Sequence, residues 1–281
     1  MMTYRDLLVQ IDETRGCAKR IELAVALAAA HEAHLTGLYV ISEPSPASFV
    51  QGSVPPDLLL GLQHETRARA DAALARFAET AQRNQIAFET RVDRVLYTEI
   101  AEAVATNARY ADLVILGQID PDDPASGPRY VPEEVVLGCG RPALIVPYIG
   151  APATFGERVM VAWDASREAA RAVNDALPLL ARAKAVSVVT VNPADRPFGH
   201  GEEPGADIGL HLARHGIKVD VQRVEVRDLD TANALLSRLA EDGTDLLVMG
   251  AYGHSRLREL MLGGATRTIL HDMTVPVLMA H

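Results

Sequence analysis

The sequence predicts an α/β protein of two tandem, doubly wound domains, each with a five-stranded, mostly parallel sheet and helices on both faces. Three observations predict it. Short apolar runs rich in β-formers alternate with longer helical segments, this order of elements occurs twice, and 281 residues suit two domains of roughly 150 residues each. Strands that alternate with helices are typical of parallel sheets, because each crossover lays a helix over one face.

The first predicted domain spans residues 1–149. An Ala-rich helical segment that ends near His34 separates its first two strands, and a longer helix runs from Pro56 to about Asn84. A Pro/Ser-rich stretch, SEPSPASFVQGSVPPD, precedes the longer helix. The expected strands of this domain are 4–11, 35–41, 86–92, 112–117 and 142–147.

The second predicted domain spans residues 157–281 and repeats the same order. It follows a linker, 148–156, that is rich in Gly, Pro and Ala, as boundaries between compact units tend to be. The expected strands of this domain are 158–163, 185–191, 217–226, 245–250 and 275–280.

Corresponding positions define the repeat. Asp12 and Asp164 each close the first strand of their half, and they lie 152 positions apart. Gly117 and Gly250 each close the fourth strand, yet they lie only 133 positions apart. The first half therefore contains about 19 extra residues upstream of its fourth strand, which we assign to the Pro/Ser-rich stretch and the longer helix.

Composition excludes several classes of protein. The chain is 48% apolar and 23% charged, which is ordinary for a globular protein. It has 27 Lys plus Arg against 37 Asp plus Glu, and the resulting net charge of −10 would repel a nucleic-acid backbone. We therefore expect no nucleic-acid partner.

The sequence also indicates the compartment. The longest unbroken apolar run, Leu23 to Ala30, is far shorter than the roughly 20 residues that a membrane span requires. The N-terminal residues MMTYRDLLVQID contain an Arg and two Asp where a secretion signal needs an apolar core. We expect a cytoplasmic protein, in which Cys17 and Cys139 are packing residues and form no disulfide. No metal site is predicted.

Glycines concentrate after the strand 245–250, at positions 250, 253, 263 and 264. Gly250 and Gly253 are expected to provide positive φ and close approach of a ligand. The later pair opens a helix, ATRTIL, whose free N–H groups can hold an anion. Thr266 can add a hydroxyl group, and Asp164 can accept a hydrogen bond from a base or a ribose. Taken alone, the same glycines also fit a turn without a ligand.

These residues resemble the universal stress protein family, whose nucleotide-binding members carry Gly, two residues, Gly, nine residues, Gly and then Ser or Thr after the fourth strand. Gly250, Gly253 and Gly263 match that spacing, and the segments DLLVMGAYGHS and VPVLM agree as well. The resemblance covers essentially the whole chain as two copies. One departure is Gly264, which stands where the family has Ser or Thr, so a hydroxyl contact to phosphate is missing there.

The resemblance implies a site for ATP, or for ADP or AMP, in the C-terminal half, with Mg²⁺ bound only through the nucleotide. Asp164 would face the adenosine, and Val191 and Met249 would line the base. The residues expected around the ribose and phosphates are Gly250, Tyr252, Gly253, Gly263, Gly264, Ala265 and Thr266.

The first half departs from the family pattern. After Gly117 the chain reads QIDPDDPASGPRY, without a second glycine at the three-residue step. Asp120, Asp122 and Asp123 are expected where phosphates would lie, and like charges there disfavour ATP. Asp12 is retained, but we predict that this nucleotide site is vestigial or altered.

The resulting hypothesis is a tandem universal stress protein that binds an adenine nucleotide in its C-terminal domain and acts as a stress-response sensor or scaffold. No catalytic residue can be named, and we expect no dedicated enzyme beyond slow ATP hydrolysis. One alternative is an interaction module of the same fold that binds unidentified protein partners and no nucleotide. Another is a nucleotidyl transferase, although no phosphate-binding or histidine motif of such enzymes is present. By analogy with the family, the two halves are expected to pair through their last strands. Whether two chains also form a homodimer is not predicted from the sequence.

Overall fold

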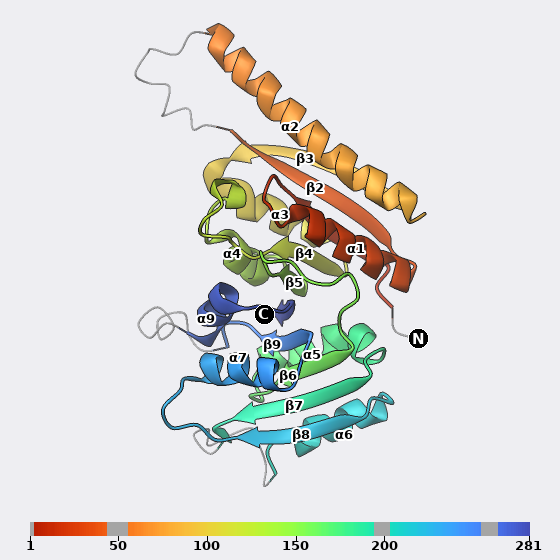
Figure 1. Cartoon of the computed structure of the whole chain (residues 1–281), viewed down its shortest axis with the longest axis vertical. Helices are drawn as coiled ribbons and strands as arrows, with labels where there is room; N and C mark the ends of the chain where they lie inside the picture. The colour runs from red at the N-terminus through yellow and green to blue at the C-terminus, as the bar shows by residue number, and fades with distance from the viewer. Residues whose placement is uncertain (1–2, 44–55, 194–202, 254–263) are drawn as a thin grey trace.

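The computed structural model describes residues 3–43, 56–193, 203–253 and 264–281. Its strands form one ten-stranded sheet in the order β3-β2-β1-β4-β5-β10-β9-β6-β7-β8 (Figure 1). Within each half all neighbouring strands are parallel, which confirms the predicted fold class.

The first half begins with strand β1 and ends with strand β5. Its elements are β1 (Asp6–Ile11), α1 (Cys17–His31), β2 (His34–Glu43), α2 (Pro56–Arg83), β3 (Phe88–Leu96), η2 (Tyr97–Glu99), α3 (Ile100–Ala108), β4 (Leu113–Gly117), η3 (Pro124–Ser126), α4 (Val131–Gly138) and β5 (Ala143–Val146). The predicted long helix is thus present as α2, whereas most of the Pro/Ser-rich stretch, 44–55, lies outside the described residues.

The second half repeats this order. Its elements are β6 (Arg158–Ala162), α5 (Arg167–Leu180), β7 (Ala185–Val191), α6 (Ala206–Arg214), β8 (Val219–Val224), α7 (Thr231–Glu241), β9 (Leu246–Gly250), α9 (Ala265–Asp272) and β10 (Val277–Ala280). Every strand ends within two residues of its expected limits except β3, which continues four residues further.

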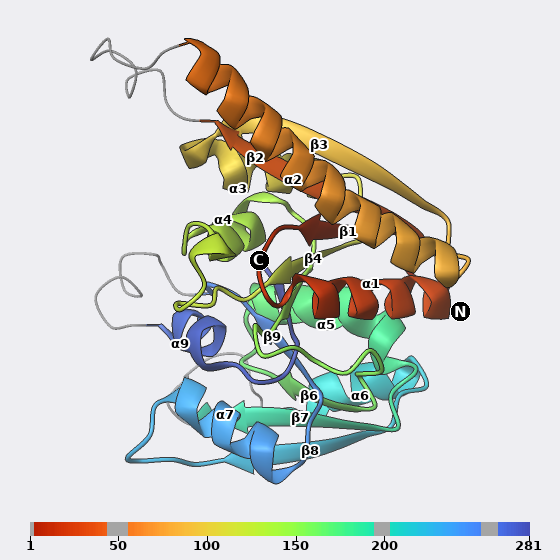
Figure 2. The ribbon, with the colours of Figure 1, turned by 45° about the horizontal axis from the view of Figure 1, so that its top comes forward.

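Two helical layers enclose the sheet (Figures 1 and 2). Helices α1, α2, α5 and α6 contribute to one apolar cluster, and α3, α4, α7 and α9 contribute to the other. The central strands therefore have buried side chains on both faces, and β4 reads as an uninterrupted apolar run, LVIL. Both clusters contain residues of both halves, so the core continues across the boundary between them.

The boundary between the halves is a pair of antiparallel strands, β5 and β10. Leu278 lies opposite Leu144, Val277 opposite Ile145, and all four side chains are fully buried. The expected pairing of the last strands within one chain is confirmed. It removes from solvent two strand edges that would otherwise be free to pair with another chain.

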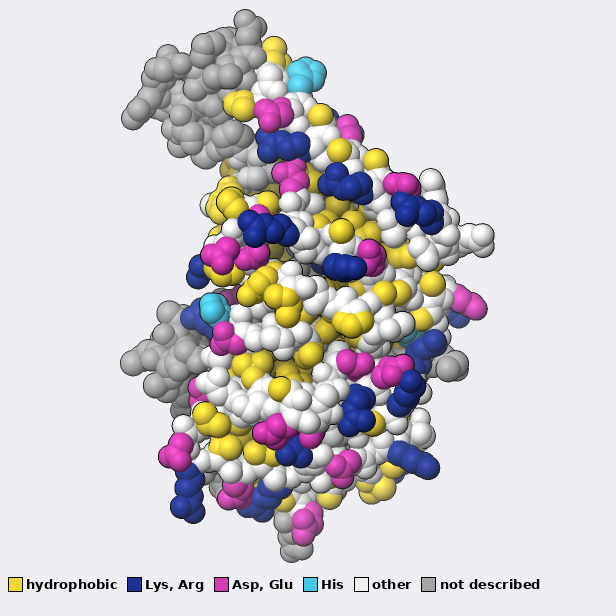
Figure 3. Space-filling view, viewed as in Figure 1, with side chains coloured by type: hydrophobic (Ala, Val, Ile, Leu, Met, Phe, Trp, Pro, Cys, Tyr) yellow, Lys and Arg dark blue, Asp and Glu magenta, His cyan; other side chains and the backbone are white. Residues whose placement is uncertain are grey.

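Basic and acidic side chains alternate over the face of the molecule shown in Figure 3. This face presents no broad basic surface, in keeping with the net charge of −10. Among the described residues, no helix is long and apolar enough to cross a membrane.

A buried histidine, His31, is the last residue of α1 and lies near the contact between the halves. The Tyr4 backbone N–H donates to Nδ1 of His31, at 3.4 Å, and the Tyr4 hydroxyl donates to the carbonyl of Asp175 in the other half, at 2.8 Å. His31 is only 2% exposed, and its Nε2 atom has no hydrogen-bond partner among the described residues. Burial, and secondarily the charge of Arg182, lower the pKa of His31.

This environment predicts a loss of stability in mild acid. Because the folded-state pKa of His31 lies below its usual value of 6.5, the unfolded chain binds the proton more readily than the folded chain does. We expect the free energy of unfolding to fall as the pH drops below that value, and to fall less in His31→Asn, whose amide oxygen can still accept from Tyr4. Denaturant titrations at several pH values between about 5 and 7.5 measure this. Equal pH slopes in the two proteins would contradict it.

Candidate functional site

Each half has one place where ligands are expected in an open α/β sheet. The chain leaves β1 toward α1 on one face and leaves the neighbouring strand β4 toward α4 on the other, and β6 and β9 repeat this arrangement. Crevices form at the carboxyl ends of strands whose connections diverge in this way. The structure therefore contains two equivalent candidate sites, one in each half.

The acids that close the first strands shape the same turn in both halves. Asp164 Oδ1 accepts hydrogen bonds from the backbone N–H and the hydroxyl of Ser166, at 3.0 and 2.6 Å. Asp12 Oδ1 accepts the same two bonds from Thr14, at the same distances. The predicted equivalence of Asp12 and Asp164 is thus also a structural equivalence, and one role of each carboxylate is to fix the turn that follows its strand.

In the C-terminal half, the glycines allow close packing. A Cβ atom on Gly250 would lie 2.4 Å from the backbone nitrogen of Ala169 in α5, so only glycine lets β9 end so close to that helix. The expectation of positive φ at Gly250 and Gly253 is wrong, since neither residue is among those with positive φ. The left-handed residue of this turn is Tyr252, with φ of 59°.

Thr266 holds the turn after β9 against the first turn of α9. Its hydroxyl accepts a hydrogen bond from the backbone N–H of Tyr252, at 3.2 Å, and the side chain is buried. The expected free phosphate-binding hydroxyl is therefore already engaged as an acceptor. Gly264 is the N-cap residue of α9 and Ala265 its first residue, as the helix expected after the glycines requires.

Four of the predicted site residues lie in one cluster, and one lies outside the described residues. Val191, Met249, Tyr252 and Ala265 belong to one apolar cluster, on the face of the sheet that carries α7 and α9. Gly263 lies outside the described residues, as do Arg256 and Arg258, which are further basic side chains of the same loop.

Glu168 is a site residue that the sequence analysis did not identify. Its side chain is 3% exposed, and its Oε2 atom would lie 3.2 Å from a Cβ atom on Gly253. Its ion-pair partner is the exposed side chain of the adjacent Arg167. An acid in the first turn of a helix is common because it complements the helix dipole, so its position in the sequence alone did not distinguish it.

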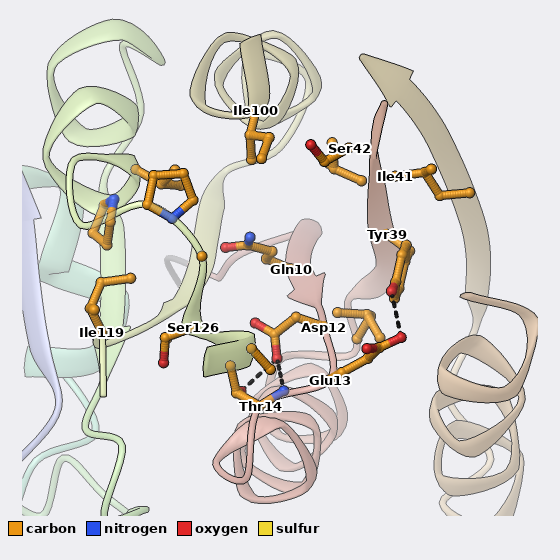
Figure 4. A pocket seen from close by; sticks show the side chains of 18 of the residues that line it. Gln10, Asp12, Glu13, Thr14, Tyr39, Ile41, Ser42, Ile100, Ile119 and Ser126 are labelled. Atoms are coloured by element: carbon orange, nitrogen blue, oxygen red, sulfur yellow. Dashed lines mark hydrogen bonds between the residues drawn. The ribbon is translucent and has the colours of Figure 1, made fainter. Parts of the chain in front are cut away.

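In the N-terminal half, the equivalent place is a cavity of about 350 Å³ (Figure 4). Its floor is the end of β1 with Gln10 and Asp12, and one wall is the end of β2 with Tyr39 and Ile41. Ile100 of α3 and the segment 125–128 close the other sides. The hollow is therefore retained in the first half, and a vestigial or altered nucleotide site there stays a prediction.

A buried arginine distinguishes the N-terminal site. Arg20 is 2% exposed; its guanidinium lies 2.5 Å from Asp12 Oδ2 and also donates to the carbonyl of Gln10, at 2.9 Å. A Cβ atom on Gly117 would lie 2.1 Å from this guanidinium, so Gly117 is needed to make room for it. Sequence spacing places Ala172 at the corresponding position of the second half.

The acids of the loop after β4 do not lie where the sequence predicts them. Asp120, Asp122 and Asp123 do not line the cavity, whereas Ser126 and Gly127 do. Asp123 accepts hydrogen bonds from the backbone N–H groups of Arg15 and Ala125, at 2.9 and 3.0 Å, and these bonds lower its pKa. Its carboxylate thus stays ionised and joins the two loops around the site, from outside the lining of the cavity.

The start of α4 is unfavourable for binding a phosphate. Pro132 has no N–H, and the N–H of Val131 already donates to the carbonyl of Pro128, at 3.1 Å. Glu133 and Glu134 add negative charge to the same turn. In contrast, the first turn of α9 contains neither proline nor an acidic residue. The helix end that could hold an anion is thus blocked in the first half and retained in the second.

Comparison with known proteins agrees with this duplicated architecture. The model of the universal stress protein family matches residues 3–127 and again residues 156–281. The chain belongs to the universal stress protein family. A curated relative, universal stress protein Slr1230 of Synechocystis, is 38% identical over 68 residues, which are 24% of this chain and 22% of the relative. The match therefore spans about a fifth of that relative's length.

Solved structures extend the likeness of this universal stress protein to the whole chain. A universal stress protein from Archaeoglobus fulgidus DSM 4304 is similar with a TM-score of 0.73 at 18% identity, covering 98% of this chain and 95% of that one. A putative universal stress protein from Pseudomonas aeruginosa UCBPP-PA14 is similar with a TM-score of 0.55 at 16% identity, covering 99% and 93%. At these identities the likeness establishes the shared fold.

Proposed function

We propose that this universal stress protein binds ATP, or the related nucleotides ADP or AMP, in its C-terminal half and acts as a stress-response sensor or scaffold. The observation that carries the proposal is the turn after β9. Gly253 adds no side chain beside Ser166 and Glu168, and Thr266 joins this turn to the start of α9, whose first turn contains neither proline nor an acidic residue. Mg²⁺ would arrive with the nucleotide and needs no protein ligands of its own.

Within this proposal the described residues have distinct roles. Asp164 accepts a hydrogen bond from the nucleoside, and Val191 and Met249 offer apolar contact to the base. The backbone from Gly250 to Gly253 and that from Gly263 to Thr266 surround the ribose and the phosphates. Because Thr266 already accepts from Tyr252, we assign phosphate binding to backbone N–H groups rather than to this hydroxyl.

A calorimetric titration of the nucleotide-stripped protein with Mg-ATP, repeated with ADP, tests the proposal. We expect one site per chain. Two sites would show that the first half binds nucleotide as well, against the blocked start of α4. An absence of heat at several temperatures would overturn the proposal and favour a protein-interaction module of the same fold.

Glu168 offers a second test, because its buried carboxylate lies beside Gly253, along the proposed phosphate path. Replacing Glu168 by glutamine removes the negative charge and keeps the shape of the side chain. We expect ATP to bind about threefold to tenfold more tightly, a gain of roughly 1 kcal/mol from relieved repulsion. Titrations of the variant with ATP, ADP and AMP measure this, and the gain should grow with phosphate number. Weaker binding of Mg-ATP would instead make Glu168 a ligand of the metal.

Three further assignments are part of the proposal. We propose domain limits of 1–149 and 157–281, the cytoplasm as the compartment, and unidentified protein partners that read the nucleotide state. A homodimer of this already paired chain is a separate question that sedimentation analysis answers.

A further inference from the structure

One basic side chain contacts the acid that borders the turn after β9. Arg167 is the first residue of α5, directly after the N-cap residue Ser166. Its Nε atom donates to Oε1 of Glu168, and the other oxygen of that carboxylate, Oε2, would lie 3.2 Å from a Cβ atom on Gly253. A single carboxylate group therefore separates the guanidinium of Arg167 from the turn to which we assign the nucleotide.

The guanidinium of Arg167 is anchored on one edge and accessible on the other. The side chain of Arg167 is 85% exposed, whereas that of Glu168 is 3% exposed. Nε is the atom that Glu168 holds, and the two terminal nitrogens donate to no acceptor among the described residues. A guanidinium has five N–H donors in a planar fork, so the donors of both terminal nitrogens are available to an anion. Because one edge is already held, ordering this side chain around a ligand costs less conformational entropy than ordering an unanchored arginine.

Two other arginines of the same helices engage the first half instead. Arg267 is in the first turn of α9, but its Nε atom lies 3.4 Å from a carboxylate oxygen of Glu133. Arg171, one turn after Arg167, pairs with Asp175 at 2.5 Å and donates to a backbone carbonyl of the first half at 2.9 Å. Of these three arginines, Arg167 is the one whose acidic partner borders the turn after β9.

The internal repeat provides an equivalent arginine in the first half. Counted from the acid that closes the first strand of each half, Arg15 corresponds to Arg167 and Gly16 corresponds to Glu168. Arg15 is exposed, and its side chain makes no ion pair or hydrogen bond with any described residue. The arginine thus occurs in both halves, but a neighbouring acid anchors it only in the half whose helix after the fourth strand begins without a proline.

We propose that Arg167 binds the phosphate chain of the nucleotide and that Glu168 positions its guanidinium. This inference rests on the proposed function of the same site, and it adds a charged donor to the backbone N–H groups assigned there. A guanidinium matches phosphate oxygens in geometry as well as in charge. The contribution of Arg167 to binding therefore grows with the number of phosphates on the nucleotide.

Calorimetric titrations of Arg167→Gln with Mg-ATP and with AMP test this proposal on the full chain. We expect ATP to bind about tenfold more weakly than in the wild type, and AMP to lose less. Arg167→Lys keeps the charge but not the planar fork, and should have an intermediate ATP affinity. Added NaCl should weaken ATP binding less in Arg167→Gln than in the wild type. Unchanged ATP affinity, or an equal loss for ATP and AMP, would overturn the proposal.

The positioning role of Glu168 is tested by a double substitution. Glu168→Ala removes the acceptor of the Arg167 Nε atom. Arg167→Gln should therefore cost about tenfold in ATP affinity in the wild type and less than about threefold in the Glu168→Ala background. The same tenfold loss in both backgrounds would show that Glu168 does not position Arg167. Thermal unfolding establishes that each variant is folded.

Arg15→Gln is the matched control, because it makes the same change at the equivalent position of the first half. It should bind Mg-ATP as the wild type does. A loss of ATP binding in Arg15→Gln but not in Arg167→Gln would place the nucleotide in the first half and overturn the proposal. If the wild type binds no ATP, the proposed function fails and this inference fails with it. If the wild type binds ATP and Arg167→Gln binds it equally well, only the role of Arg167 fails.

Discussion

Replacing Arg20 by methionine is expected to lower the free energy of unfolding by about 3 kcal/mol, the largest effect on stability that we predict. The guanidinium is 2% exposed and joins Asp12 of the turn after β1 to the backbone of Gln10. Without it, the Asp12 carboxylate loses its counter-charge in a mostly buried position, and the Gln10 carbonyl loses a donor. Denaturant unfolding at neutral pH measures the change.

Two further proteins separate this effect from a general loss of charge. Arg67→Met breaks a pair with Asp71 in which both side chains are about half exposed, and it should cost less than about 0.5 kcal/mol. Adding Asp12→Asn to Arg20→Met removes the stranded carboxylate and should restore part of the stability. If the double substitution is as damaging as the sum of both single changes, the ion pair is not what stabilises this turn.

Substituting valine for Gly253 is expected to abolish measurable ATP binding while the chain stays folded. A Cβ atom there would lie 3.2 Å from Glu168 Oε2 and 3.5 Å from Ser166 Oγ, so the first carbon is already a tight contact. The branched methyl groups of valine have to project toward the proposed path of the phosphates. We expect a loss of at least about a hundredfold in affinity, or roughly 2.7 kcal/mol, by calorimetric titration.

Graded and remote substitutions make this result interpretable. Gly253→Ala adds only the first carbon and should have an intermediate affinity. Gly61→Val places the same side chain on α2, where a Cβ atom meets nothing within 4 Å, and should bind ATP as the wild type does. Thermal unfolding of each variant establishes that it is folded. Unchanged ATP affinity in folded Gly253→Val would remove the turn after β9 from the site.

The sequence by itself determined the repeated order of strands and helices, the place of the two candidate sites and the equivalence of Asp12 and Asp164. These features follow from local rules. A strand buried on both faces must be apolar throughout, as in β4 and β9, and a turn needs its acid and its hydroxyl residue at fixed spacing. The same rules hold in each half of the chain. The pairing of β5 with β10 came from resemblance to a family and is now visible in the register of Leu278 with Leu144.

Only the tertiary structure decided which side chains meet at the two sites. Arg20 lies within a helix that starts five residues after Asp12, and Glu168 is an ordinary first-turn acid; nothing in their spacing shows that one neutralises Asp12 and the other lies beside Gly253. The acids of the loop after β4 were assigned to the wrong place for the same reason. A side chain's partner depends on how elements distant in the sequence pack, and the energy of a buried charge depends on that partner more than on its neighbours along the chain.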